Sequence, residues 1–199
     1  MMISALLGLL TTFQPAALQA WSVDPIPYGA SAAGIVLLDV AVDGQGAVGE
    51  VKVLQDIAPF TDLIRGRLST WRFRPAHEDG RAVATHVLVA GVFAPAMLQF
   101  PAPTQPLVPD PEPDASVPFP TTVAFAPYPA RAMGDAGLMV EVALGADGAL
   151  RSAKAVAGTP GFGDVSVSTA KQWIFRAASR KRVNVPARAY LFFSYRQPH

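Results

Sequence analysis

Apolar and polar residues alternate in two stretches of the chain, at residues 36–42 and at residues 138–144. A period of two is typical of a β-strand that buries one face. The two stretches keep the same apolar phase and lie 102 positions apart, and each is followed by a turn with glycine and a second β-like stretch, at 48–54 and at 150–156. The pattern predicts two β-hairpins of the same design.

The same offset of 102 positions joins many other residues. Trp71-Arg72-Phe73-Arg74 returns as Trp173-Ile174-Phe175-Arg176. The offset also joins acidic, glycine and aromatic positions, namely Asp39 to Glu141, Gly46 to Gly148, Phe60 to Phe162 and Asp62 to Asp164. Agreement of so many residue types predicts an internal repeat, and a repeat fixes the architecture of a chain. We therefore expect two copies of one small domain.

Each copy is predicted to fold as a ββαβ unit. After the first hairpin, apolar residues at helical spacing predict a helix over residues 60–71, and residues 83–93 are predicted as a third strand. The second copy repeats this order with a helix at 162–175 and a strand at 183–195, preceded by a short helix at 129–133. The predicted fold class is α+β, with two tandem domains, each a three-stranded antiparallel sheet covered by one helix.

The two copies are separated by a segment that is rich in proline. The first copy spans residues 21–94 and the second spans residues 121–199, and residues 95–120 between them contain nine prolines. This density favours an extended, polyproline-like chain, so we predict a semi-rigid linker. A proline-rich ligand for another protein is the alternative reading of the segment.

Residues 1–20 are predicted to be a signal peptide or a short anchor. They carry no charged residue, and their apolar run around Leu6 to Leu10 has the length of a signal-peptide core. Leu18-Gln19-Ala20 is compatible with cleavage after Ala20. The run is shorter than the roughly 20 apolar residues of a transmembrane helix. Because no Lys or Arg precedes the run, an N-terminal helix of a cytosolic protein is a third reading.

Composition narrows the classes of chemistry that the chain can perform. It has 199 residues and no cysteine, which excludes disulfides, thiol catalysis and thiolate metal sites. Hydrophobic residues make up 51% and charged residues 16%, which predicts a folded chain. Residues 165–199 contain seven Lys or Arg and no Asp or Glu, so the rest of the chain carries −6 within the total of +1. Such asymmetry is typical either of a partner surface or of a helix end and a strand edge that are both basic.

One pattern of turns and aromatic residues runs through both copies. It consists of a hairpin with an Asp-Gly turn, a helix followed by Trp-x-Phe-x-Pro-Ala, a glycine, and a strand that ends in Phe. The first copy carries its second part, as Trp71-Arg72-Phe73-Arg74-Pro75-Ala76, Gly80, Val83 and Phe93. The second copy carries its first part, as Tyr128-Pro129, Gly137 and Asp147-Gly148, with Ala177-Ala178 in place of Pro-Ala. These motifs, which cover both copies, resemble the TonB C-terminal domain family.

The resemblance implies a periplasmic domain that supports outer-membrane transport by offering an exposed edge strand to a short transporter peptide. In that mode of binding, backbone hydrogen bonds provide the affinity. The matching strand is the last one of each copy, at residues 85–92 and 188–195. We expect partner binding to be concentrated in the second copy, with an edge at Arg188, Tyr190, Phe192 and Ser194. The alternative is that this strand pairs with a second protomer, as a homodimer, or with the other repeat. Trp71, Phe73, Trp173 and Phe175 are expected to be structural core residues.

For a full energy transducer, the resemblance implies an anchor, then a long Pro-rich spacer, and then one terminal domain. The segments of this chain have a different order. Here the leader runs almost directly into the first copy, and the Pro-rich segment lies between the copies. The leader also lacks a histidine to match the anchor motif of the family. A soluble or peripherally held periplasmic adaptor fits this arrangement better than a proton-coupled transducer, and contact with the inner membrane is left open.

Few residues suggest catalysis. His77-Glu78-Asp79 lies where a polar loop is expected, and the Gly-rich loop at 158–163 lacks the Lys-Ser/Thr of a phosphate-binding loop. The chain has neither an H-E-x-x-H zinc motif nor a G-x-S-x-G nucleophile motif. We therefore predict no catalytic residue, no metal ligand and no cofactor.

The function predicted from the sequence is non-enzymatic binding in the periplasm. We expect a TonB-like protein that binds peptides of outer-membrane transporters or other envelope proteins in support of transmembrane transport. One alternative is an envelope scaffold or dimerisation module with no energy-transducing role. Another is single-stranded nucleic-acid binding through Trp173, Tyr190 and Phe192 beside the basic residues, although an exported leader argues against a nucleic-acid partner.

Overall fold

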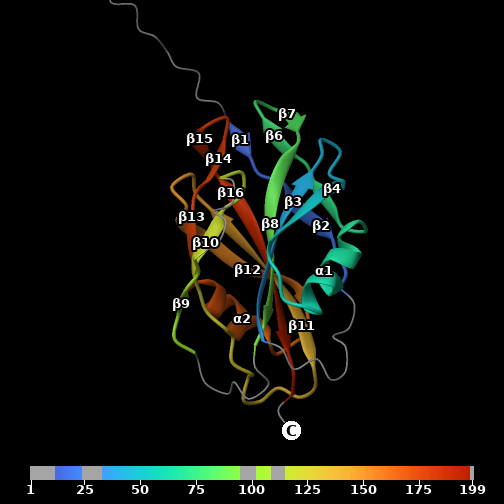
Figure 1. Ribbon diagram of the computed structural model, residues 1–199, viewed down its shortest axis with the longest axis vertical. Helices are drawn as coiled ribbons and strands as arrows, with labels where there is room; N and C mark the ends of the chain where they lie inside the picture. The colour runs from blue at the N-terminus through green and yellow to red at the C-terminus, as the bar shows by residue number, and fades with distance from the viewer. Residues whose placement is uncertain (1–11, 24–32, 95–101, 109–114, 198–199) are drawn as a thin grey trace, which may run out of the picture.

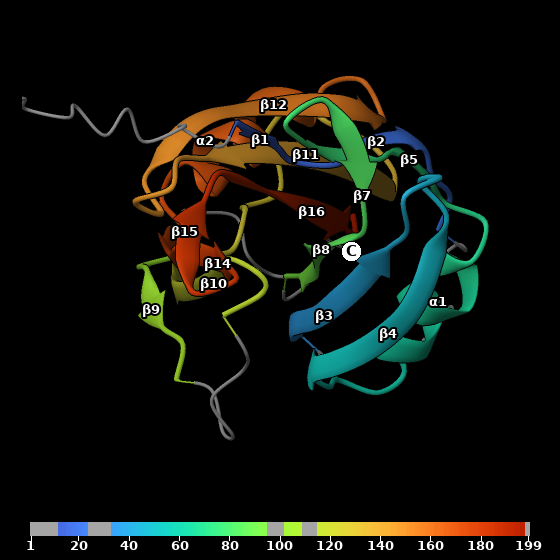
Figure 2. The same cartoon turned by 90° about the horizontal axis from the view of Figure 1, so that it is seen from above.

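Six strands form one sheet at the centre of the molecule. The computed structural model describes residues 12–23, 33–94, 102–108 and 115–197. The strands are β3 (Gly34–Val42), β4 (Val48–Gln55) and β8 (Thr85–Phe93) from the first copy, and β11 (Ala136–Leu144), β12 (Leu150–Gly158) and β16 (Ala187–Tyr195) from the second. Their order in the sheet is β12-β11-β16-β8-β3-β4 (Figures 1 and 2). The fold is mainly β with two short helices.

The offset of 102 positions applies to the structure element by element. The bounds of β3 and β11 differ by 102 residues at both ends, and so do those of β8 and β16. The helices α1 (Phe60–Leu68) and α2 (Gly163–Ala170) follow the same spacing to within one residue. Each copy contributes three antiparallel strands, as predicted from the alternating pattern.

The prediction of two separate three-stranded sheets is too simple. The last strands of the two copies, β8 and β16, pair in parallel, with Ala189 beside Leu88 and Ser194 beside Phe93. This seam joins the copies into one mixed sheet. Both strands are apolar on both faces, and strands of that kind are stable only where each face and each edge is covered.

The two helices cover opposite faces of the sheet. Val87 and Val89 of β8 belong to the apolar core that contains Ile64 of α1, whereas Leu88 belongs to the core that contains Phe162 near α2. Because successive strand residues point to opposite faces, α1 and α2 lie on different sides (Figure 2). Each copy therefore contributes side chains to both cores.

Both helices end earlier than predicted. α1 ends at Leu68 and α2 at Ala170, and the aromatic pairs follow them in extended chain. Trp71 and Phe73 are buried, and the arginines that alternate with them are exposed. This alternation has the period of a strand, so the tryptophans close the core from β-structure and not from a helix.

Three short strands follow each helix, and the last two of each copy lie at one end of the molecule (top of Figure 1). In the first copy they are β5 (Arg72–Arg74), β6 (Ala76–Glu78) and β7 (Arg81–Val83), and in the second they are β13 (Ile174–Arg176), β14 (Ala178–Arg180) and β15 (Val183–Val185). β6 pairs with β7, and β14 pairs with β15. The predicted third strands, 83–93 and 183–195, are thus each divided into a hairpin strand and a sheet strand.

Each copy also has an N-terminal arm, which the predicted boundaries left out entirely in the first copy and in part in the second. In the first copy the arm contains β1 (Phe13–Gln14), paired with β6, and β2 (Ala17–Ala20), paired with β5. In the second it contains β10 (Phe119–Val123), which pairs with β13 and with β9 (Gln105–Pro106). The Trp71 indole N–H donates to the Ser22 carbonyl at 2.7 Å, and Trp173 donates to Ala124 at 3.1 Å. These contacts keep the 102-residue offset.

Three predictions about the flanking segments therefore need correction. Residues 12–20 of the predicted leader lie within the fold, so a cut after Ala20 would remove both β1 and β2. Val117 and Phe119 of the predicted linker are buried. The predicted helix at 129–133 is a turn closed by the Ala132 N–H and the Pro129 carbonyl, because its apolar residues have no periodic face to bury. The apolar run at residues 3–10 lies outside the described residues.

No helix within the described ranges is both long enough and apolar enough to span a bilayer.

Candidate binding sites at a sheet edge and between two hairpins

The predicted partner-binding strand is not an edge. β16 lies between β11 and β8 and is paired on both sides. Tyr190, Phe192 and Ser194 are buried, with Tyr190 fully inaccessible, and the Arg188 side chain is 23% exposed. The prediction of an open edge at these residues is wrong, and its alternative, pairing with the other repeat, describes the structure. The aromatic side chains of this strand are packed in the two apolar cores, Tyr190 and Phe192 in one and Phe193 and Tyr195 in the other.

Tyr190 connects the second copy to the arm of the first. Its hydroxyl accepts a hydrogen bond from the Leu18 N–H at 2.8 Å and donates to Glu141 Oε2 at 3.2 Å. Glu141 is itself buried and pairs with Lys154 Nζ at 3.1 Å. Burial, followed by the Glu141 charge, raises the pKa of Tyr190. The phenol therefore stays protonated and serves as a structural anchor for β2.

The first copy has an equivalent buried carboxylate at Asp39. His86 Nδ1 lies 2.7 Å from Asp39 Oδ1, and the Ser116 hydroxyl donates to Oδ2 at 3.5 Å. In a serine hydrolase the imidazole lies between the hydroxyl and the carboxylate, but here the carboxylate lies in the middle. The cluster therefore does not form a relay that would activate the serine. Within the described part of the chain, no group of three or more side chains is arranged to hold a metal ion.

The outermost strands of the central sheet are β12 and β4 (Figure 2), and no other described strand pairs with their outer edges. Seven of the nine β12 residues are exposed. Register shifts interrupt its pairing with β11 near each end, and residues 152–155 between them keep a regular register. β4 has a shorter regular run, 51–53, and is less exposed. Register shifts at an edge discourage pairing, so the longer regular run makes β12 the better template for an added strand.

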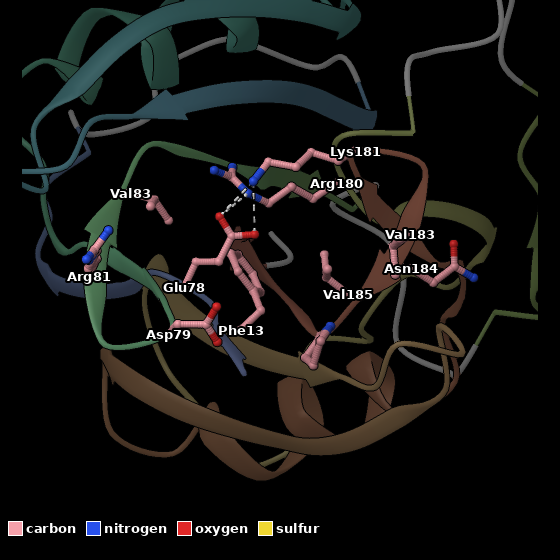
Figure 3. Close-up of a pocket in the computed structure, with 11 residues that line it drawn as sticks. Phe13, Glu78, Asp79, Arg81, Val83, Arg180, Lys181, Val183, Asn184 and Val185 are labelled. Atoms are coloured by element: carbon pink, nitrogen blue, oxygen red, sulfur yellow. Dashed lines mark hydrogen bonds and ion pairs between the residues drawn. The ribbon is translucent and has the colours of Figure 1, made fainter. Parts of the chain in front are cut away.

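A groove of about 880 Å³ lies between the β6–β7 and β14–β15 hairpins (Figure 3). β8 and β16 pair only from Leu88 and Ala189 onward, so the chain before these residues diverges and carries the hairpins apart. Phe13, Val83, Val183 and Val185 give the groove an apolar lining. Its charged residues include Glu78, Arg180 and Lys181.

Arg180 and Lys181 cross from the second copy to the first. The Arg180 guanidinium donates to the Ala84 carbonyl at 2.7 Å and lies 5.8 Å from the centre of the Phe13 ring. Lys181 Nζ pairs with Glu78 Oε2 at 3.1 Å, and Arg180 Nε lies 3.6 Å from the same oxygen. Glu78 is thus shared by two cations (Figure 3), and this interaction holds the two hairpins on either side of the groove.

The predicted core residues are all buried, whereas the predicted site residues do not form a site. Trp71, Phe73, Trp173 and Phe175 are at most 7% exposed. The β12 edge and the groove were not predicted. One sequence feature could have indicated the groove. The repeat offset aligns the Asp79-Gly80 turn with Lys181-Arg182, so the second copy has two cations where the first has a common turn pair.

Comparisons with protein-family models, with curated proteins and with solved structures find no match for this chain. The resemblance to the TonB C-terminal domain family therefore depends on the motifs quoted above.

Proposed function

We propose that the protein is a non-enzymatic, TonB-like binding protein of the periplasm that holds an extended peptide along β12. The partner is a segment of an outer-membrane transporter or of another envelope protein. The observation that carries the proposal is the open regular edge at residues 152–155, which is exposed and offers its backbone for one more strand. Addition of a strand to such an edge takes its affinity from backbone hydrogen bonds.

The side chains along β12 support this use of the edge. Ser152, Ala153 and Ala155 are small, so a second backbone can approach closely. The Lys154 side chain is 63% exposed, although its amine pairs with Glu141. A cation at the centre of the edge favours an acidic or neutral peptide over a basic one. The class of partner predicted from the sequence, a peptide of an envelope protein, is therefore kept, but we propose β12 and not β16 as its binding site.

Attachment to the envelope is part of the same proposal. Because a cut after Ala20 would remove β1 and β2, we favour a leader that is retained or is cut before Thr12. The sequence of the N-terminus of the purified envelope protein tests this point. A mature chain that starts at Trp21 would contradict it.

Dimerisation through β12 is the competing function, since the edge that accepts a peptide also accepts the same strand of a second chain. The nucleic-acid alternative depended on stacking by Trp173, Tyr190 and Phe192. All three rings are buried, so we do not propose it.

Site-specific photo-crosslinking in intact cells tests the proposal. A photoreactive residue at Ser152 of β12 is compared with one at Glu50 of β4, which occupies the equivalent exposed position of the other copy. We expect Ser152, and not Glu50, to give an adduct with an envelope protein. An adduct of twice the chain mass would favour the dimer. Equal yields at both positions, or no adduct at Ser152, would contradict peptide capture at β12.

A further inference from the structure

The turn between β14 and β15 has an unfavourable backbone conformation. Lys181 and Arg182 have φ values of 51° and 66°, in the left-handed region. The equivalent turn of the first copy uses Asp79 and Gly80 at 52° and 78°. Asp-Gly is among the preferred pairs for a two-residue hairpin turn of this kind, whereas left-handed conformation costs a residue with a Cβ roughly 1–2 kcal/mol. The second copy therefore carries two cations at a cost in stability.

Strained backbone of this kind is often found at functional sites, and this turn stands at the mouth of the groove. Lys181 lines the groove, and its side chain is 72% exposed. Arg81, an exposed residue of β7, lines the opposite wall. Among the described residues, Arg81 and Arg182 have no carboxylate within ion-pair distance, while Lys181 shares Glu78 with Arg180. Asp79 lines the groove as well, so the lining carries three cations, Arg81, Arg180 and Lys181, against the two carboxylates Glu78 and Asp79. Arg182 is the neighbour of Lys181 in the turn, so the groove and its turn have more positive charge than their own carboxylates neutralise.

The walls of the groove are apolar and extended. Val183 is 64% exposed, which is unusual for a large aliphatic residue of a strand, and Val83 and Val185 are half-buried beside the same space. In the part of the chain that the structure describes, β15 pairs only with β14, so its other side is open. A volume of about 880 Å³ lies within the range of sites that enclose small ligands or short peptide segments.

We propose that this groove is a second binding site, for an extended anionic peptide segment. Aliphatic side chains of the segment lie against Val83, Val183 and Val185, and its carboxylates meet Arg81 and Lys181. Arg182 adds positive charge beside Lys181 in the turn. The walls favour a peptide over a membrane surface, because a flat bilayer does not enter a groove between two hairpins. The site is separate from β12 and does not depend on the function proposed for that edge.

The test uses the full chain and a fluorescein-labelled hexapeptide of alternating Val and Glu. We expect binding by fluorescence anisotropy, a loss of affinity with added salt, and shifts of the Val183–Val185 amide resonances. The variant Lys181→Asn/Arg182→Gly introduces the preferred turn pair and removes both cations. It is expected to bind the peptide at least tenfold more weakly while its melting temperature rises. The control Arg131→Gln/Lys171→Gln removes two exposed cations elsewhere and should leave binding unchanged.

A second variant covers the case in which the turn substitution disturbs the hairpin. Arg81→Gln changes the other wall without touching that turn, and it should weaken binding severalfold. A labelled hexapeptide of alternating Val and Lys serves as the charge control. Unchanged binding of the Val-Glu peptide in both variants, or equal binding of the Val-Lys peptide to the unmodified chain, would overturn the proposal. Binding to phosphatidylglycerol vesicles in preference to the peptide would replace it by a membrane contact. Crosslinking at Ser152 should be unaffected by the turn variant, so the two sites can fail separately.

Discussion

Individual residues show how the two copies depend on one another. Asp39 and Glu141 occupy equivalent positions, and each lies beneath the N-terminal arm of the other copy: Ser116 contacts Asp39, and the Leu18 N–H bonds to Tyr190, the partner of Glu141. The sequence predicts the equivalence of the two carboxylates from their spacing. It could not predict their burial, because the arms that cover them come from more than 70 positions away in the chain.

Buried tyrosines should make the fold sensitive to high pH. Burial raises the pKa of Tyr195 to about 12, and it also raises the pKa of Tyr190. An unfolded tyrosine ionises near pH 10, so the stabilisation is complete below that pH and is lost as the pH rises toward 12. We expect the free energy of unfolding to fall by about 1 kcal/mol per pH unit for each tyrosine above pH 10, measured by urea titration.

Tyr195→Phe provides the control for this pH dependence. Ser166, which bonds to the Tyr195 hydroxyl at 2.6 Å, keeps its bond to the Phe162 carbonyl, so the variant should fold. Its unfolding free energy should depend less steeply on pH above 10 than that of the wild type. If the unfolding free energies of the variant and the wild type depend equally on pH above 10, ionisation of the Tyr195 phenol does not contribute to the loss of stability.

At the scale of elements, the sequence predicts what depends on local pattern. The hairpins, their turns and the presence of two helices follow from alternation, Asp-Gly pairs and apolar spacing. The helix ends were misplaced because Trp71 fits a helical stripe and a strand equally well by spacing alone, and its contact with Ser22 decides between them. The β12 edge and the groove depend on how β8 and β16 join, which no local pattern records.

Substitution of two turn glycines, Gly46 and Gly80, distinguishes the cost of backbone strain from the cost of a steric clash. A Cβ on Gly46 would overlap the Phe73 carbonyl oxygen, whereas a Cβ on Gly80 would meet no atom within 4 Å. Both have positive φ, at 83° and 78°. Gly80→Ala should therefore cost about 1 kcal/mol of unfolding free energy from strain alone, and Gly46→Ala about 3 kcal/mol or more. Equal losses in chemical denaturation would contradict the close approach of β5 to this turn.

Removal of the first arm tests whether residues 12–20 belong to the fold. A chain that starts at Trp21 loses β1 and β2, the buried Ala16 and the bond between Leu18 and Tyr190. It should be less stable than a chain that starts at Thr12 by about 3 kcal/mol or more, since an apolar contact and a buried hydrogen-bond partner are both lost. Equal melting temperatures of the two chains would show that residues 12–20 do not stabilise the fold and would support their assignment to the leader.

At the scale of the whole molecule, the parallel seam between β8 and β16 determines both proposed sites. It buries the aromatic strand that the sequence indicated as an edge, and it leaves β12 as the open side of the second copy. It also starts only at Leu88 and Ala189, which opens the groove between the hairpins. The parallel seam between the two copies therefore accounts for the position of the open edge at β12 and for the groove between the hairpins.

Amide hydrogen exchange measured by NMR tests this arrangement most directly. If β16 is central, the amides of residues 189–193 should exchange only through global unfolding, as slowly as those of β8. The amides of residues 152–155 that face away from β11 should exchange orders of magnitude faster. Exchange at residues 189–193 as fast as at the β12 edge would contradict the shared sheet. It would indicate that the last strand is an exposed edge, as the sequence predicted.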